Sequence, residues 1–244
     1  MNIKSFAGKS DAYVVSEWQE RHSHSGHPAA PPLDPSVTIS YQTGAGMREI
    51  APLVAQQLEK TDSEERRPWT IYDQQLIEES LEENLWPREL AARITEDKRL
   101  FLDELVDDLF GLRPPSWVLV PQLVKTILRL AVGGRAILAG YGVTVVTAGL
   151  PNVFHVRLIG SLPRRLDRIQ QRQNLAPEAA ARFIRNKDRG RERFVKAHFH
   201  ARLDDEMHYD LVLNTDRLSE PDAAAVIADA AHRFFNAKSL SSQS

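Results

Sequence analysis

Short apolar runs rich in β-branched residues recur along the chain, and each is followed by a segment with helical character. Strands that alternate with helices predict a parallel sheet, because a helix must carry the chain back across the sheet before the next strand can begin. The helices then cover both faces of that sheet. We therefore expect an α/β fold with about five parallel strands. The runs are Val37–Tyr41, Thr70–Asp73, Arg135–Gly140, Val153–Ile159 and Tyr209–Asn214.

The segments between these runs predict the helices. Apolar residues in Met47–Leu58 recur at i, i+3, i+4 and i+7 with one polar exception, which is typical of an amphipathic helix. Pro52 lies inside this segment and predicts a kink or a late start of the helix. Val120–Val132 is apolar around much of its circumference, so we expect it to lie buried beside the sheet. Further helices are expected at 74–85, Lys98–Leu109 and Pro221–Phe235.

Length and composition limit the protein class. A chain of 244 residues with 42% hydrophobic and 26% charged residues suits one large α/β domain or two small ones. The absence of cysteine excludes disulfides, iron–sulfur clusters, thiolate zinc sites and cysteine nucleophiles. No apolar run approaches the roughly 18–20 residues of a membrane span, and the N-terminus lacks the apolar core of a signal peptide. We expect a cytoplasmic protein with no membrane contact.

The composition predicts three segments along the chain: a disordered tail, a folded domain and a flexible C-terminus. Residues 1–35 are rich in proline, glycine and polar residues, which predicts a disordered tail. Its histidines, His22, His24 and His27, are typical of adventitious metal binding. The folded domain is expected at 36–238, with residues 239–244 as a flexible C-terminus.

Charge is distributed unevenly. The net charge is −2, but Gln57–Asp108 holds 16 acidic and 7 basic residues, whereas Arg157–Arg193 holds 11 basic and 4 acidic residues. Such a division argues against a uniform surface for polyanions. One concentrated basic segment suits a small anionic ligand such as a nucleotide, or a short contact with nucleic acid. It also fits two solvated helix faces of opposite charge.

A glycine turn lies between the first strand and the first helix, in the residues TGAGMRE at 43–49. Glycines let the backbone bend so that several N–H groups face one anion, and the helix N-terminus adds positive potential. This arrangement suits a phosphate, although a purely structural turn also fits. The full Walker pattern is absent, because Met47 stands at the lysine position and Arg48 at the hydroxyl position.

Arginines crowd two helical segments in the second half of the chain, around Arg164–Arg168 and Arg185–Arg193, with Asp188 among them. Planar guanidinium groups neutralise phosphate oxygens, and a carboxylate can orient one of them. A solvated basic helix face explains the same pattern. Aromatic residues are not interleaved for stacking on bases, so nucleic acid is not expected as a partner.

Together these features resemble the cytidylate kinase-like branch of the nucleoside monophosphate kinases, a branch without the Walker lysine. The resemblance covers about Ser36–Phe235 and rests on five motifs in the right order. The motifs are ISYQTGAGMREIA, IYDQQLI, NVFHVRLIGSLPRRLDRI, IRNKDRGRERF and YDLVLNTDRLS. The resemblance implies a three-layer P-loop kinase-like fold with a helical lid at about 172–204. It further implies ATP and Mg²⁺ as cofactors and a nucleotide as substrate, and it leaves homo-oligomerisation open.

The resemblance also implies binding residues, region by region. The phosphate-binding turn would contain Gly44, Ala45, Gly46, Met47, Arg48 and Glu49. The acceptor entrance would be formed by Tyr72 and Asp73. The phosphate donor would lie beside Arg165 and Arg168. The lid would contribute Asp188, Arg189, Arg191 and Arg193. Asn214 and Thr215 would lie near the donor base, unless they form a simple strand-ending turn.

The catalytic role is expected for Arg48, Arg189 and Arg193, with Arg48 in place of the missing lysine. Two departures bear on activity: Met47 carries no charge, and Tyr141 stands where the family tends to have a phosphate-contacting arginine. The implied function is phosphoryl transfer from Mg-ATP to a nucleoside monophosphate or similar small acceptor. The alternative is a catalytically degenerate nucleotide-binding module that acts through a protein partner.

Four further histidines are not expected to act as a base or as metal ligands. His155 lies within an apolar strand run, which is more typical of a satisfied core histidine than of a base. His198, His200 and His208 lie near Asp204 and Asp205, but their spacing matches no metal-ligand pattern.

Overall fold

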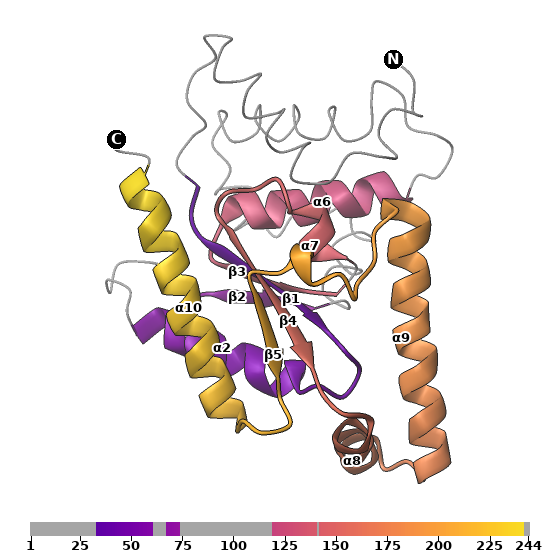
Figure 1. Cartoon of the computed structure of the whole chain (residues 1–244). Helices are drawn as coiled ribbons and strands as arrows, with labels where there is room; N and C mark the ends of the chain where they lie inside the picture. Colours follow the sequence, from indigo (N-terminus) through magenta and orange to yellow (C-terminus); the bar gives the residue numbers. More distant parts are fainter. Residues whose placement is uncertain (1–32, 61–66, 74–118, 141, 242–244) are drawn as a thin grey trace.

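The computed structural model describes residues 33–60, 67–73, 119–140 and 142–241 (Figure 1). The expected helices at 74–85 and Lys98–Leu109, residues 1–32 of the expected tail, and Tyr141 lie outside the described residues. The described elements are β1 (Ser36–Tyr41), α2 (Met47–Lys60), β2 (Thr70–Tyr72), α6 (Leu119–Gly133), β3 (Ala136–Ala139), α7 (Val143–Val146), β4 (Val153–Ile159), α8 (Leu162–Gln173), α9 (Pro177–Phe199), the 3₁₀ turn η2 (Glu206–His208), β5 (Leu211–Asn214) and α10 (Glu220–Ser241).

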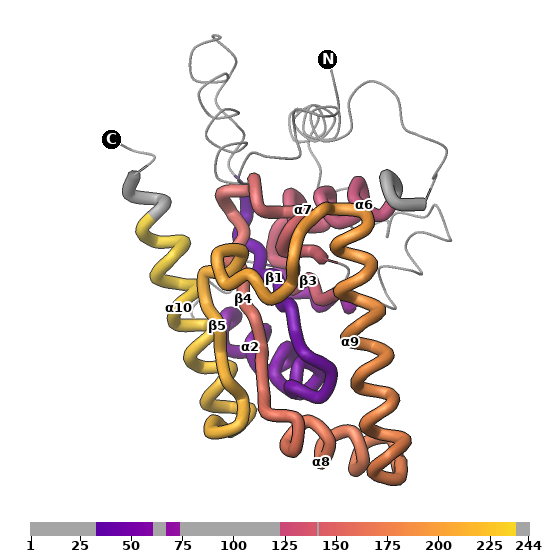
Figure 2. Tube along the Cα trace, turned by 45° about the vertical axis from the view of Figure 1, so that its right-hand side comes forward, coloured from indigo at the N-terminus to yellow at the C-terminus, as the bar shows by residue number. Residues whose placement is uncertain are grey.

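The strands form one five-stranded parallel sheet in the order β2-β3-β1-β4-β5. One apolar cluster joins a face of this sheet to α2 and α10, and a second cluster joins the opposite face to α6 and α7. The α/β fold with helices on both faces, expected from the alternation of strands and helices, is confirmed. Figures 1 and 2 show α8 beyond the ends of β1 and β4, with α9 running from α8 back toward α6.

The two faces of β1 differ in chemistry. Val37 and Ile39 are fully buried against α2 and α10. Ser36, Thr38 and Ser40 alternate with them and are also buried, but they face α6 and α7. On that side Ser36 Oγ donates a 3.0 Å hydrogen bond to a carbonyl of α6, and Thr38 Oγ1 lies 3.3 Å from a hydroxyl of α7. The centre of the sheet is therefore apolar on one face and polar on the other.

The neighbouring strand β4 continues the polar face. His155 lies opposite Thr38 in the parallel register, and Arg157 lies opposite Ser40. His155 is buried, and its Nδ1 is 2.8 Å from Thr38 Oγ1. This contact confirms the expected core histidine, held by hydrogen bonds.

Several element boundaries differ from expectation for local reasons. β3 begins at Ala136, because Arg135 has a φ of 52° and cannot continue an extended strand. β5 begins at Leu211, because the chain just before it forms the turn η2, which the Tyr209 N–H closes by donating to the Glu206 carbonyl.

The helices follow the sequence pattern more closely. α2 begins at Met47 with Pro52 inside it, so the late start that the proline suggested is wrong. α6 spans the expected range, and its residues from Leu123 to Val132 are largely buried in the core, as predicted. α10 continues to Ser241, past the end expected at Phe235.

The connections diverge at the carboxyl ends of two adjacent strands, β1 and β4. β1 leads through α2 to β2 at one side, whereas β4 leads through α8 and α9 to β5 at the other. The chain thus leaves the carboxyl ends of the adjacent strands β1 and β4 in opposite directions. Ligands of open α/β sheets bind at such a switch point.

Candidate nucleotide-phosphate site

The glycine turn lies at this switch point, between β1 and α2. Gly44 and Gly46 have φ values of 85° and 87°, a conformation that side chains other than glycine rarely adopt. A Cβ on Gly44 would lie only 2.6 Å from the Arg165 carbonyl oxygen, so α8 packs directly against the turn. The Ala45 N–H closes the turn with a 2.9 Å hydrogen bond to the Gln42 carbonyl.

The turn leaves backbone donors available for a ligand. Within the described part of the chain, the N–H groups of Gly44, Gly46, Met47 and Arg48 have no hydrogen-bond acceptor. Met47 and Arg48 form the first turn of α2, where the N–H groups have no partner inside the helix. Convergent free N–H groups at a helix N-terminus form a binding site for a phosphate or similar anion.

Asp188 on α9 joins the turn to two arginines. Its Oδ1 accepts hydrogen bonds from the Thr43 N–H at 2.9 Å and from the Thr43 hydroxyl at 2.7 Å. Arg165 contacts Oδ2 at 2.7 Å, and Arg191 contacts Oδ1 at 2.5 Å. The Arg191 guanidinium also lies 4.7 Å from the centre of the Tyr41 ring. The carboxylate thus occupies a cradle of donors that would equally suit a phosphate.

The environment of Asp188 favours its charged form. Burial alone would raise the pKa of this carboxyl, but hydrogen bonds from the Thr43 backbone and hydroxyl and from Arg165, together with the charge of Arg191, hold the pKa below its ordinary value. The side chains of Arg165, Asp188 and Arg191 are only 11%, 21% and 16% exposed, so water screens the group weakly. Among the described residues, the buried Arg165 Nε finds no hydrogen-bond partner.

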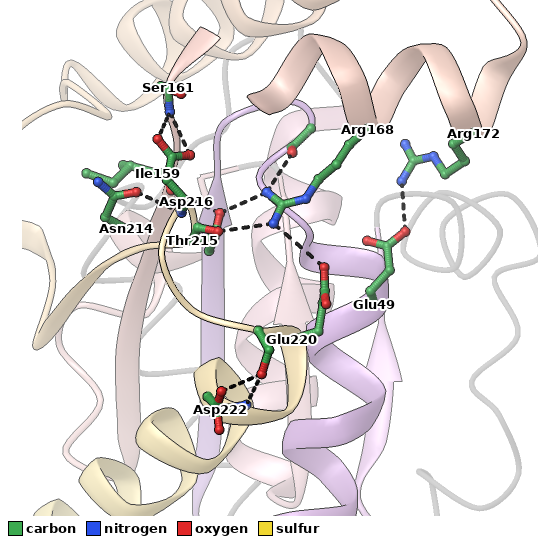
Figure 3. A network of polar contacts seen from close by, with 12 residues as sticks. Glu49, Ile159, Ser161, Arg168, Arg172, Asn214, Thr215, Asp216, Glu220 and Asp222 are labelled. Atoms are coloured by element: carbon green, nitrogen blue, oxygen red, sulfur yellow. Dashed lines mark hydrogen bonds and ion pairs between the residues drawn. The ribbon is translucent and has the colours of Figure 1, made fainter. Parts of the chain in front are cut away.

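A second guanidinium links the turn to the last strand. Arg168 donates from Nη1 to the Gly44 carbonyl at 3.4 Å and to Thr215 Oγ1 at 3.1 Å, and from Nη2 to the Thr215 carbonyl at 3.1 Å. Figure 3 shows Arg168 between Thr215 and Glu220, which forms an ion pair at 3.6 Å. Glu49 of the turn pairs with Arg172 of α8 at 3.6 Å. The amino-terminal end of α2 is thereby lined with α8 arginines.

The structure brings together some of the residues expected from sequence. Those that meet around the turn are Gly44, Ala45, Gly46, Met47, Glu49, Arg165, Arg168, Asp188, Arg191 and Thr215. Asn214 lies at the end of β5, where its side-chain oxygen accepts from the Asp216 N–H at 3.0 Å. Met47 is buried in the core, so its side chain forms the floor of the turn rather than contacting a ligand.

The side chains of other expected residues take no part in these contacts, although the backbone N–H of Arg48 belongs to the turn. Arg48, Arg189 and Arg193 are exposed and make no ion pair within the described part of the chain. Arg189 and Arg193 lie one helical turn apart on the outer side of α9, where Arg193 Nε donates to the Arg189 carbonyl at 3.3 Å. Tyr72 is buried and Asp73 half-buried at the end of β2, two strands away from β1 in the sheet.

Sequence reasoning missed two contributors. Thr43 supplies both its N–H and its hydroxyl to Asp188, but a threonine before a glycine is common in structural turns. Arg157 is buried on β4 and donates a 2.6 Å hydrogen bond to Ser40 Oγ. Arg157 could have been noticed in the sequence, because it is a charged residue within a run of apolar strand residues.

The described residues offer no ready metal centre. Across 33–60, 67–73, 119–140 and 142–241, histidine, aspartate and glutamate side chains nowhere gather in threes that could hold a metal ion. Asp188, which contacts the glycine turn through Thr43, is already held by Arg165 and Arg191. The free N–H groups and guanidinium groups around the turn suit an anion such as a phosphate. Among the described helices, none has both the length and the apolar character needed to cross a bilayer.

Comparisons with known proteins identify the family of the chain and a structure with a similar fold. Residues 36–217 match the family described as cytidylate kinase-like. No curated protein matches the sequence significantly. The crystal structure of an uncharacterized protein from Eubacterium ventriosum has a similar fold, with a TM-score of 0.54, 11% identity, and coverage of 82% of this chain and 99% of that one. TT1252 from Thermus thermophilus is 17% identical, with a TM-score of 0.41 over 82% of this chain and 98% of its own.

Proposed function

Since the chain belongs to the cytidylate kinase-like family, we propose that it transfers a phosphoryl group from Mg-ATP to a nucleoside monophosphate or a similar small acceptor. Family membership supports a kinase-like, nucleotide-binding fold, and the reaction and substrates are the proposal. The observation that carries it is the set of free N–H groups in the glycine turn, beside Arg165, Arg168 and Arg191. A backbone cradle next to several guanidinium groups is the arrangement that polyphosphate binding requires.

Binding would begin with an exchange of anions. The free N–H groups of the turn would take the donor phosphates, which carry more charge than the single carboxylate of Asp188. Arg165 and Arg191 would then be shared between Asp188 and the phosphates, and the α9 lid would follow the arginines toward the nucleotide. Lids of this kind exclude water from the transferred group.

Catalysis would rest on positioning and charge neutralisation. Phosphoryl transfer needs the attacking and leaving oxygens in line, with cations around the transferred group. Arg48, Arg189 and Arg193 are the exposed guanidinium groups available to move onto a bound nucleotide, and we assign them the catalytic role. Mg²⁺ would be held mainly by the nucleotide phosphates and water, so no step is assigned to a metal bound by the protein.

One observation favours a second function, a nucleotide-binding module without turnover. Met47, at the position of the Walker lysine, is only 6% exposed and packs in the core, so this position supplies no charge to a transferring phosphoryl group. Such a module would bind the same ligands through the same turn and act through a protein partner.

Product formation tests the proposal. The protein is incubated with Mg-ATP and a panel of nucleoside monophosphates, and the nucleotides are resolved by chromatography. A new diphosphate is expected, and it should disappear in R165M, which removes one guanidinium from the cradle, but persist in the control R233M. Arg233 is an exposed arginine of α10 that, among the described residues, pairs with Asp229 at 2.9 Å.

The negative outcomes separate the two functions. Nucleotide-dependent thermal stabilisation of the folded protein without any product would establish the binding module and exclude the kinase. No stabilisation and no product would overturn both functions.

A further inference from the structure

Arg157 is a buried cation on β4 that takes no part in the contacts described above for the glycine turn. The residue is 9% exposed. Its Nη1 donates a 2.6 Å hydrogen bond to Ser40 Oγ, and the guanidinium carbon lies 5.7 Å from the centre of the Tyr209 ring. Within the described part of the chain it makes no other hydrogen bond and no ion pair with a carboxylate. A guanidinium has five N–H donors, so most of them are left for a ligand.

Nearby carboxylates act on Arg157 through their charge but form no ion pair with it within the described part of the chain. Burial lowers the pKa of this guanidinium, and the nearby charge of Arg191 lowers it as well, although Tyr209, Asp188 and Glu192 act in the opposite direction. Asp188 is already shared between Arg165 and Arg191. A buried charge without a partner is costly, and charged side chains are almost never buried unless they are paired.

The place of Arg157 in the fold points to a ligand rather than to a structural partner. It lies opposite Ser40 in the pairing of β1 with β4, close to the carboxyl ends of both strands, where the chain diverges. The phosphate turn begins just after Ser40, at the end of β1. Arg191 approaches the same strand end from α9, with its guanidinium over Tyr41. Two arginines from different elements, Arg157 and Arg191, therefore lie near the same end of the sheet.

The groups around Arg157 fix its orientation. The Tyr209 hydroxyl donates to the Leu203 carbonyl at 2.9 Å and lies 3.2 Å from Ser40 Oγ. Its ring supports one face of the guanidinium, and Ser40 holds one end. The planar group is thus held in place before a ligand arrives, which reduces the entropy lost on binding.

We propose that Arg157 binds a phosphate group of the small anionic substrate at the carboxyl ends of β1 and β4, together with Arg191. This assignment rests on the proposed function for the identity of the substrate, but not for the chemistry of the ligand, which is a phosphate group presenting two oxygens to the guanidinium fork. That phosphate belongs either to the donor nucleotide or to the acceptor monophosphate, and the experiment has an arm for each.

The test compares the wild-type protein with R157M and R202M. Methionine has a similar length without charge. Arg202 is a 75% exposed arginine that pairs with Asp204 in the described part of the chain, so R202M serves as the matched control. Thermal stability is measured without ligand. Affinities for Mg-ATP, a panel of nucleoside monophosphates, pyrophosphate and inorganic phosphate are measured by calorimetry at constant ionic strength.

The expected result for R157M has two parts. Its melting temperature without ligand should equal or exceed that of the wild type, because removal of an unpaired buried charge offsets the lost hydrogen bond. Its affinity for phosphate ligands should fall about 10- to 100-fold, the effect of losing a charge-assisted hydrogen bond. A loss confined to monophosphates assigns Arg157 to the acceptor, and a loss confined to Mg-ATP assigns it to the donor. R202M should change neither quantity.

Two outcomes overturn the assignment. Unchanged affinity of R157M for every ligand would exclude a binding role, and a lowered melting temperature with intact affinity would establish a structural one. If R157M does not fold, R157K decides the question. It keeps the charge, and it should lose affinity because an ammonium cannot replace the two-pronged contact, so full affinity would overturn the proposal.

The same data separate this assignment from the proposed function. Product formation by R157M at the wild-type rate and affinity would overturn the role of Arg157 and leave the kinase reaction standing. Binding of inorganic phosphate or pyrophosphate through Arg157, with no nucleotide bound and no product, would leave the Arg157 site standing and overturn the proposed function.

Discussion

The inner and outer sides of α9 carry the same kind of residue in different environments. On the inner side Arg191 is 16% exposed and bound to Asp188 and Thr43. On the outer side Arg189 and Arg193 are exposed and have no carboxylate partner among the described residues. This arginine-rich segment therefore contains two kinds of arginine. Arg191 is held at the glycine turn by Asp188 and Thr43, whereas Arg189 and Arg193 are exposed to solvent.

The difference follows from helical phase. Ile184, Asp188, Arg191 and Val195 recur at spacings of three and four residues, which places them on one side of a helix. Ile184 and Val195 are buried, and they turn Asp188 and Arg191 toward the body of the protein. The packing of two apolar residues thus determines which charges reach the site.

The largest expected effect comes from D188N, which removes the charge at the centre of the inner side. It leaves Arg165 and Arg191 half-buried without a carboxylate, and we expect a loss of about 3 kcal/mol in the free energy of unfolding. Affinity for pyrophosphate should rise, because both arginines become available. Urea denaturation and calorimetry measure the two quantities. A variant as stable as the wild type, or with weaker pyrophosphate binding, would contradict the account.

Substitutions of the inner arginines should have the next largest effect. R165M and R191M each remove one partner of Asp188, and we expect each to cost about 1–2 kcal/mol of unfolding free energy. Each should also weaken Mg-ATP binding about tenfold or more. Equal Mg-ATP affinity in wild type, R165M and R191M would show that the inner side is structural.

The pH dependence of stability gives a smaller effect with a defined sign. The pKa of Asp188 is lowered in the folded protein, mainly by its hydrogen bonds with Thr43 and Arg165, which overcome the effect of burial. A carboxyl whose pKa is lowered by folding stabilises the fold at pH values above its ordinary pKa of about 3.9. This contribution to the free energy of unfolding is lost as the pH falls below that value. The difference in stability between wild type and D188N should therefore narrow as the pH is lowered from 6 toward 3, in urea titrations. If the difference in unfolding free energy between wild type and D188N grows as the pH is lowered, the account is contradicted.

The smallest effect on stability is expected on the outer side. R189A and R193A should each change the unfolding free energy by less than about 0.5 kcal/mol, because exposed side chains without partners contribute little. If these arginines carry the proposed catalytic role, kcat should fall while the affinity for Mg-ATP stays the same. Unchanged kcat in both variants would remove them from the mechanism.

Much of the fold was predictable because it depends on local patterns. Apolar runs predicted every described strand, and the alternation with helices predicted their parallel pairing. The glycines at 44 and 46 predicted a turn that requires positive φ. The boundary of β3 was missed because the φ of Arg135 depends on the path of the chain out of α6 rather than on residue type.

The site was predicted only in part, because its contacts are long-range. Asp188 and Thr43 meet across 145 residues, and Arg157 and Ser40 across 117, so no local spacing indicates either pair. The division of α9 into two sides was within reach of the sequence, since helical periodicity separates Asp188 and Arg191 from Arg189 and Arg193. The family resemblance placed all four residues in one lid, and helical phase would have assigned them to two sides of it.

The central claim is that the glycine turn binds nucleotide phosphates through its free N–H groups. Amide chemical shifts of ¹⁵N-labelled protein, followed by NMR during titration with Mg-ATP, test it most directly. The amides of Gly44, Gly46, Met47 and Arg48 should show the largest shifts, and the Thr43 amide should shift with them as Asp188 is displaced. Saturable binding that leaves these amides unchanged and shifts residues elsewhere would contradict the account.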